Sequence, residues 1–166
     1  MLASHSPTGT CYVYHPKASE KIVNFGVAWE GLFGYVQGVQ VTDTIYLSGQ
    51  LSHDQSGALV APAPLDESGK PVDFGQMEEQ IRQTYRNAIA LLSEFGATLD
   101  DVVEETLYVL DVDAAFTAGG KVRKEVYGTE QPQCASNIIG ATRLAFPAQL
   151  VEITFRAVVG SDLALA

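Results

Sequence analysis

The chain has 166 residues, of which 46% are hydrophobic, enough apolar material for one compact domain with a buried core. Its formal net charge of −10 repels phosphate backbones, and no run of Lys or Arg offers a local basic patch, so a nucleic-acid partner is not expected. The two cysteines are too few for a disulfide framework.

Several other classes of protein lack their sequence signals here. No basic segment precedes an apolar stretch near the start, and no window approaches the roughly 18 apolar residues of a membrane helix. We therefore expect no signal peptide, no membrane partner and a cytoplasmic location. The histidines lack metal-ligand spacing, and neither common glycine-rich phosphate loop is present, so we expect no metal site and no cofactor.

Three segments are expected along the chain. Residues 1–33 form an N-terminal extension and entry segment, residues 34–160 a single domain, and residues 161–166 a C-terminal tail. Within the extension, residues 10–14 have the β-branched and aromatic character of a short strand. Residues 15–33 show no clear period, which predicts an irregular or partly stranded segment.

A hairpin opens the domain. Residues 36–41 and 44–48 alternate between two faces and read as antiparallel strands about a turn at Thr42 and Asp43. Residues 52–73 are rich in Pro and Gly, which predicts a surface loop, and such loops often form the rims of sites.

Two helices and a strand are expected next. Apolar residues recur at a spacing of three and four from Met77 to Phe95, which predicts an amphipathic helix that Asp73 or its neighbours cap. Residues 102–109 have the composition of a buried strand. Residues 115–127 predict a weaker helix, interrupted by two glycines at its centre.

The last two strands are expected at residues 137–140 and 150–159. The order of elements favours an α+β fold, a mixed six-stranded sheet with both helices on one face. The other face would carry too few charged residues to be well solvated, so we expect the chain to form oligomers.

The most distinctive motifs are Tyr35-Val36-Gln37-Gly38 and Leu47-Ser48-Gly49-Gln50. A hydroxyl followed by a glycine at a strand end leaves backbone amides open to a ligand. Together with Phe95-Gly96-Ala97 and Leu150-Val151-Glu152-Ile153, they resemble the motifs of the reactive-intermediate deaminase family, the Rid or YjgF-like proteins, also labelled endoribonuclease L-PSP. The resemblance covers about residues 34–159.

The resemblance implies a chorismate-mutase-like fold and a homotrimeric barrel with three sites in the clefts between subunits. It also implies that Tyr35 and Ser48 face a small-molecule ligand, that the Gly49 amide helps to orient it, and that Glu152 activates water. The pattern alone leaves alternatives open. Glu152 is either a proton shuttle among apolar neighbours or a carboxylate on the exposed side of an alternating strand, and a strand tyrosine often serves only packing.

The chain departs from the family pattern at two positions. Ser136 stands where the Pro-Ala-Arg motif has its arginine, which in deaminating members holds the substrate carboxylate, a contact worth roughly 1.5–3 kcal/mol. Asp113 stands where active members usually have asparagine, and it would repel an anionic substrate. We expect Asp113, Ser136, Ile138 and Arg143 to contact the ligand, although Arg143 could equally be a surface residue, and we expect a substrate other than the usual imino acid.

Three functions follow from these residues. The first is an enzyme that hydrolyses an enamine or imine, with Glu152, Ser48 and Tyr35 as the catalytic set. The alternative is a trimer that binds a metabolite in a regulatory role without turnover. An endoribonuclease or translation inhibitor is a third reading, which the acidic charge disfavours.

Overall fold

The computed structural model describes residues 20–160, which form a mixed six-stranded sheet with the order β1-β2-β3-β6-β4-β5. Only β4 and β5 pair in parallel, and every other pair is antiparallel. The strands are β1 (Glu20–Val23), β2 (Gly38–Val41), β3 (Thr44–Gln50), β4 (Val102–Val109), β5 (Ala135–Gly140) and β6 (Val151–Val158). The helices are α1 (Ala28–Phe33), α2 (Met77–Glu94) and α3 (Val112–Tyr127), with a 3₁₀ turn η1 (Leu99–Asp101).

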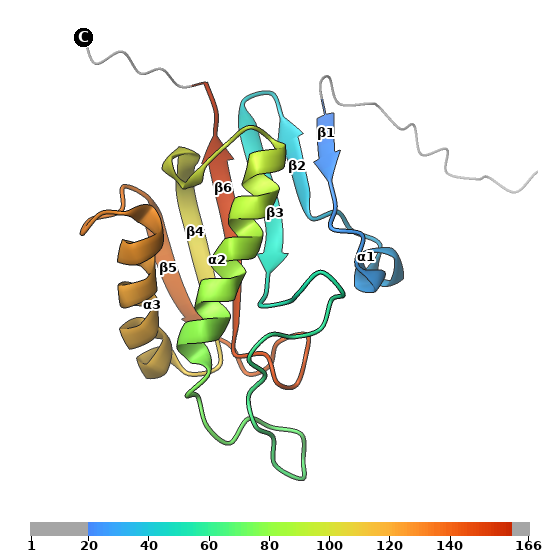
Figure 1. Ribbon diagram of the computed structural model, residues 1–166, viewed down its shortest axis with the longest axis vertical. Helices are drawn as coiled ribbons and strands as arrows, with labels where there is room; N and C mark the ends of the chain where they lie inside the picture. Colours follow the sequence, from blue (N-terminus) through green and yellow to red (C-terminus); the bar gives the residue numbers. More distant parts are fainter. Residues whose placement is uncertain (1–19, 161–166) are drawn as a thin grey trace, which may run out of the picture.

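Helices α2 and α3 lie side by side over one face of the sheet, and the opposite face carries no helix (Figure 1). The core lies between these layers because alternate strand residues point toward the helices, such as Ile45 and Leu47 on β3 and Ile153 and Phe155 on β6. Tyr85 and the apolar stripe of α2 cover them. The predicted mixed sheet of six strands with two helices on one face is therefore confirmed.

The entry segment is more regular than its sequence indicated. Strand β1 pairs with β2, and α1 follows it, so residues 20–160 contain three α-helices where two were expected. The carboxylate of Glu30 accepts hydrogen bonds from the backbone N–H groups of Phe25 and Gly26, and Gly34 ends the helix in the left-handed conformation. The strand expected at residues 10–14 lies outside the described residues, and β1 is the sixth strand of the sheet.

Helix α2 begins differently from the prediction. Its N-cap is Gln76, which makes no side-chain cap bond, whereas Asp73 accepts a hydrogen bond from the backbone of Gly75 in the turn before the helix. The Met77 N–H donates to the carbonyl of Phe74. The end is as predicted, because Gly96 adopts φ +76° after the last turn.

Helix α3 runs without a break through Gly119, so the predicted interruption is wrong. Asp111 caps it by accepting a hydrogen bond from Ala114. A Cβ on Gly119 would lie only 3.7 Å from Leu107 and 3.8 Å from Ile81. These are ordinary contact distances, and the helix continues because its buried face, which includes Ala115 and Val122, packs on the core and offsets the low helix propensity of the glycine.

The loop between β3 and α2 contains two matching turns. In each turn an aspartate Oδ1 accepts three hydrogen bonds, from the backbone N–H and the hydroxyl of the serine two residues later and from the backbone N–H four residues later. The first turn consists of Asp54, Ser56 and Ala58, and the second of Asp66, Ser68 and Lys70. Asp54 and Asp66 therefore have lowered pKa values, for which the bonds from their own turns are the largest cause. The predicted surface loop is locally ordered.

None of the helices within residues 20–160 combines the length and apolar character that crossing a bilayer requires.

Candidate functional site

A pocket of about 510 Å³ lies where α1, the end of β3 and the start of β6 meet. It brings together four residues that the sequence analysis selected, Tyr35, Ser48, Gly49 and Glu152. The remaining lining is mostly aromatic and aliphatic, namely Trp29, Phe33, Leu51, Ala145 and Phe146. Its size lies within the range of small-molecule sites.

A β-bulge exposes the floor of this pocket. Leu47 pairs with Phe155 and Gln50 pairs with Ile153, so Ser48 and Gly49 together oppose one residue of β6. The Ser48 N–H donates to Gln37 and its hydroxyl donates to the carbonyl of Val36, at 2.9 and 2.7 Å. The bulge therefore removes Ser48 and Gly49 from the regular hydrogen-bond pairing with β6, while the bonds of Ser48 to Val36 and Gln37 fix its position.

Glu152 lies directly over Gly49. A Cβ at position 49 would be 2.0 Å from Glu152 Oε1 and 2.6 Å from its carboxyl carbon, far inside contact distance. Only glycine leaves room for the carboxylate, which gives a physical reason for the glycine of the Ser-Gly-Gln motif.

Gln149 fixes two parts of the pocket. Its side chain is fully buried, and its Nε2 donates to the carbonyl of Val151 and, at 3.3 Å, to Glu152 Oε2. Its Oε1 accepts from the Phe146 N–H at 3.2 Å. One amide thus links the acidic group to the aromatic residue across the pocket.

Tyr35 closes one side of the pocket and keeps its proton. Its hydroxyl accepts a 3.2 Å hydrogen bond from Gln37, whose Oε1 accepts from the buried Gln50 at 2.9 Å. Burial raises the pKa of Tyr35, donors on Trp29 and Gln37 oppose this, and nearby carboxylates, including Glu152, raise it further. The phenol is therefore a neutral hydrogen-bond donor at neutral pH.

An aromatic wall faces the acidic group. The Trp29 ring packs edge to face with Phe146 at 5.3 Å and with His53 at 5.4 Å between centroids. His53 is only 4% exposed and its Nδ1 lies 2.7 Å from the carbonyl of Asp54, so it is a buried packing residue.

The pocket carries one negative charge and no positive one among its lining residues. Glu152 takes part in none of the eight ion pairs between described side chains. Residues 20–160 also contain no group of three His, Cys, Asp or Glu side chains placed to hold a metal ion. Within the described chain the site is an apolar, aromatic cavity with an acidic floor.

Comparison with known proteins places the chain in a family. Residues 27–159 match the family model described as Endoribonuclease L-PSP. The chain belongs to this family. The resemblance to Rid and YjgF-like proteins is thereby confirmed, and the L-PSP match includes α1 and its pocket residue Trp29.

Several relatives of this chain have names that state a family or an activity. A RutC family protein of Saccharolobus solfataricus is 35% identical over 120 residues, which cover 72% of this chain and 82% of the relative. A 2-iminobutanoate/2-iminopropanoate deaminase of Dermatophagoides farinae is 26% identical over 125 residues, covering 75% and 86%. A solved structure of a YjgF/YER057c/UK114 family member from Mycobacterium tuberculosis has a TM-score of 0.66 at 25% identity, covering 85% of this chain and all of that one.

The other predicted ligand contacts of this L-PSP family member lie apart from the pocket within one chain. Asp113 is exposed in the first turn of α3, and Ser136 and Ile138 lie on β5, at the edge of the sheet. Arg143 lines a second pocket. A role for these four residues in the same site stays a prediction that depends on a neighbouring copy of the chain.

Ser136, which is itself exposed on β5, donates a hydrogen bond to the buried carboxylate of Glu105. The Glu105 carboxylate is fully buried and accepts from Ser136 at 2.9 Å, Tyr85 at 2.8 Å and Tyr127 at 3.0 Å, and it forms an ion pair with Arg123. Burial opposes the charge on Arg123, but the adjacent carboxylate outweighs burial, so the pKa of Arg123 is raised. Within one chain the Ser136 hydroxyl therefore stabilises the Glu105 carboxylate.

Sequence reasoning missed Trp29, Phe146 and Gln149. The two aromatic residues lie in aperiodic segments more than a hundred residues apart, and nothing in their local pattern separates a pocket wall from ordinary packing. Gln149 offered one signal, since it stands two residues before the Val-Glu-Ile motif in an apolar run.

Proposed function

We propose that this chain hydrolyses the C=N bond of a small imine, or of its enamine tautomer, that is neutral or cationic and carries no carboxylate. The observation that carries the proposal is the Glu152 carboxylate, held over Gly49 in a pocket whose other walls are aromatic and whose lining includes no Lys or Arg. Relatives named as deaminases act, by those names, on 2-imino acids, whose carboxylate such a pocket would repel.

The proposed chemistry uses groups already in place. Glu152 takes a proton from a water molecule, whose oxygen attacks the imine carbon, and the protonated carboxyl then gives that proton to the nitrogen. The carbon–nitrogen bond of the resulting carbinolamine then breaks, which releases the amine or ammonia and leaves a carbonyl product. The Tyr35 phenol and the Gly49 amide orient the substrate, and Ser48 holds the bulge that presents them.

The aromatic wall suits a protonated imine. An iminium ion carries positive charge, which the faces of Trp29 and Phe146 and the carboxylate of Glu152 would all stabilise in a partly desolvated pocket. A carboxylate on the same substrate would be placed near Glu152 without a compensating cation.

We also propose that the chain works as a homotrimer with the site at the subunit boundary. The helix-free face of the sheet presents Tyr46 and Ile139, 43% and 45% exposed, and Phe33 beside the pocket is 86% exposed. A monomer would leave these groups in water, whereas a neighbouring copy would cover them and close the pocket.

Matched substrates test this proposal. Flavin-dependent oxidases acting on 2-phenylethylamine and on phenylalanine generate imines that differ by one carboxylate, and the decay of each imine is followed spectroscopically with and without the protein. We expect acceleration of the first at least about tenfold greater than of the second. Glu152→Gln should abolish it, whereas Glu104→Gln, on the same sheet face, should not. No acceleration of either imine, or full activity in Glu152→Gln, removes the proposal.

A binding role without turnover is the second candidate, supported by Ser136 in place of the family arginine and by its engagement with Glu105. It predicts that amines or imines raise the melting temperature without being consumed. Ribonuclease activity fits the site less well, because neither the net charge nor the pocket lining favours phosphate.

A further inference from the structure

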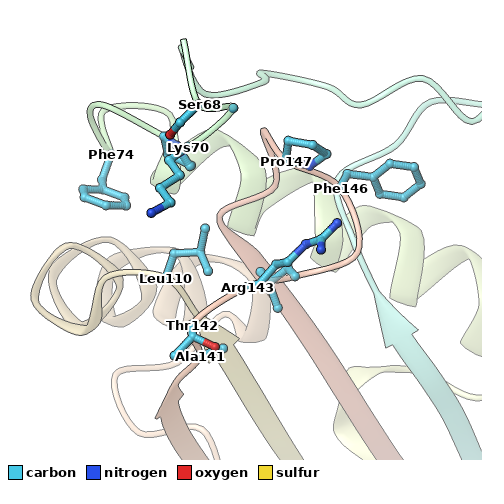
Figure 2. Close-up of a pocket in the computed structure, with 12 residues that line it drawn as sticks. Ser68, Lys70, Phe74, Leu110, Ala141, Thr142, Arg143, Phe146 and Pro147 are labelled. Carbon is cyan, nitrogen blue, oxygen red and sulfur yellow. The ribbon is translucent and has the colours of Figure 1, made fainter. Parts of the chain in front are cut away.

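A second pocket, of about 520 Å³, lies beside the first and shares Phe146 with it. Its walls are the turn at Ser68–Pro71 and the segment 141–147, and Phe74 and Leu110 contribute apolar surface between them (Figure 2). Its volume is again that of a small-molecule site. The proposed imine hydrolysis makes no use of it.

Lys70 and Arg143 are the charged residues in the lining of this pocket. Nine Lys and Arg residues fall within the described part of the chain, and seven of them bind a carboxylate or a backbone carbonyl through their side chains. Neither the Lys70 ammonium nor the Arg143 guanidinium has an ion pair or side-chain hydrogen bond with another described residue. On a chain with a net charge of −10, the two cations that have no such partner within residues 20–160 therefore line one cavity.

The walls that carry these cations are fixed before any ligand arrives. The backbone of Lys70 is tied into its turn by Asp66, whose carboxylate accepts the Lys70 N–H at 3.0 Å. The Ala63 N–H donates to Ala148, which joins this loop to the segment that carries Arg143. Gln80 on α2 reinforces the junction, because its Nε2 donates to the carbonyls of Ala61 and Ala148 at 2.8 and 2.9 Å. A preformed cavity loses little conformational entropy on binding.

We propose that this second pocket binds a small organic anion, a carboxylate or phosphate group attached to an apolar body. The guanidinium of Arg143, which Figure 2 shows directed toward Phe146, can bind a planar or tetrahedral oxyanion with two parallel hydrogen bonds, and Lys70 adds a point charge from the turn on the other side of the pocket. Phe74, Leu110 and Leu144 offer apolar surface to the rest of the molecule. Asp66 Oδ1 accepts the bonds of its own turn, and the Asp66 carboxylate attracts the Lys70 ammonium without forming an ion pair with it.

Calorimetric titration of the full chain at low ionic strength tests the site with three probes of equal chain length: hexanoate, hexyl phosphate and the neutral hexanamide. We expect one or both anions to bind and the amide to bind at least about tenfold more weakly. The two anions separate a carboxylate site from a phosphate site. Arg143→Gln and Lys70→Gln should each weaken anion binding about ten- to a hundredfold, whereas Lys124→Gln, a control on the exposed face of α3, should leave it unchanged.

Four results would overturn the proposal. The first two are that neither anion binds at about 10 mM and that hexanamide binds as tightly as the anions. The third is that Lys124→Gln weakens anion binding as much as Arg143→Gln does. The fourth is that Trp29→Ala does so, which would place the anion in the aromatic pocket. The oligomeric mass of each variant is measured in parallel. A change of mass in Lys70→Gln or Arg143→Gln would make the cavity a subunit contact instead of a ligand site.

Discussion

Substituting Gly49 by alanine should disable the aromatic pocket without unfolding the protein. The new Cβ would lie 2.0 Å from Glu152 Oε1, while ordinary contact begins at 3.4 Å, so the oxygen must retreat by about 1.4 Å. A misplacement of about 1 Å at a reacting group can cost a hundredfold in rate, or about 2.7 kcal/mol of transition-state stabilisation. The clash extends from the carboxylate to the Cγ of Glu152 at 2.8 Å, so the whole side chain must turn away, but none of the three nearest atoms belongs to the backbone and the strain on the fold should be small.

The assay is kcat/KM for hydrolysis of the phenylethylamine-derived imine, together with urea unfolding of the same samples. Gly49→Ala should lower kcat/KM at least about a hundredfold and change the free energy of unfolding by less than about 1 kcal/mol. Gly120→Ala is the matched control, because a Cβ there meets nothing within 4 Å. It should leave kcat/KM unchanged and stabilise α3 by up to about 1 kcal/mol.

A double-mutant cycle checks that the effect acts through the carboxylate. In a Glu152→Ala background the clash is absent, so Gly49→Ala should cause little further loss of activity or of imine binding. The reasoning is refuted if Gly49→Ala keeps activity within about threefold of the parent, or if its loss simply adds to that of Glu152→Ala.

Three further changes probe other parts of the molecule. Arg123→Met should lower the free energy of unfolding by about 3 kcal/mol in urea titrations, because it leaves the buried Glu105 charge without its cationic partner. Adding Glu105→Gln should recover much of this loss, and a loss below about 1 kcal/mol would contradict the reasoning. Burial, followed by the Glu105 charge, raises the pKa of Tyr85 and Tyr127, so the stability that these residues contribute is fully present below the unfolded pKa of 10.0 and is lost as the pH rises above it. In Tyr127→Phe the free energy of unfolding should therefore fall less steeply with pH between about 10 and 11. An unchanged slope would count against the cluster around Glu105. Trp29→Ala should reduce kcat/KM for the phenylethylamine-derived imine at least about tenfold but leave the smallest aliphatic imines nearly unaffected, and equal losses would show a structural role.

The sequence predicted the sheet and its two covering helices because their signals are periodic and long. The apolar stripe of α2 and the alternation of β6 repeat often enough to fix both type and face. Helix α1 was missed because its six residues include a glycine and are too short to show a period. Gly119 misled the prediction because propensity favours a break, whereas the buried face of α3 keeps the helix continuous by packing on the core.

The floor of the site was predictable for a different reason. Ser48, Gly49 and Glu152 belong to short motifs whose residue types are explained by the bulge and by the clash at position 49. The wall opposite was not predictable, because Trp29 and Phe146 meet only through the tertiary path of the chain. A ligand contact for Ser136 stays a prediction, and its bond to Glu105 was not predictable because it depends on the parallel register of β4 and β5, which no local pattern specifies.

The matching turns at Asp54 and Asp66 make the loop between β3 and α2 modular. Each turn is closed by bonds within five consecutive residues, so its shape is encoded locally and requires little from the sheet. The position that ends the second turn, Lys70, can therefore be exchanged for another side chain while its backbone keeps the same hydrogen bond. Diversification of ligand preference among relatives can proceed at this loop without disturbing the core, and laboratory libraries can be confined to it.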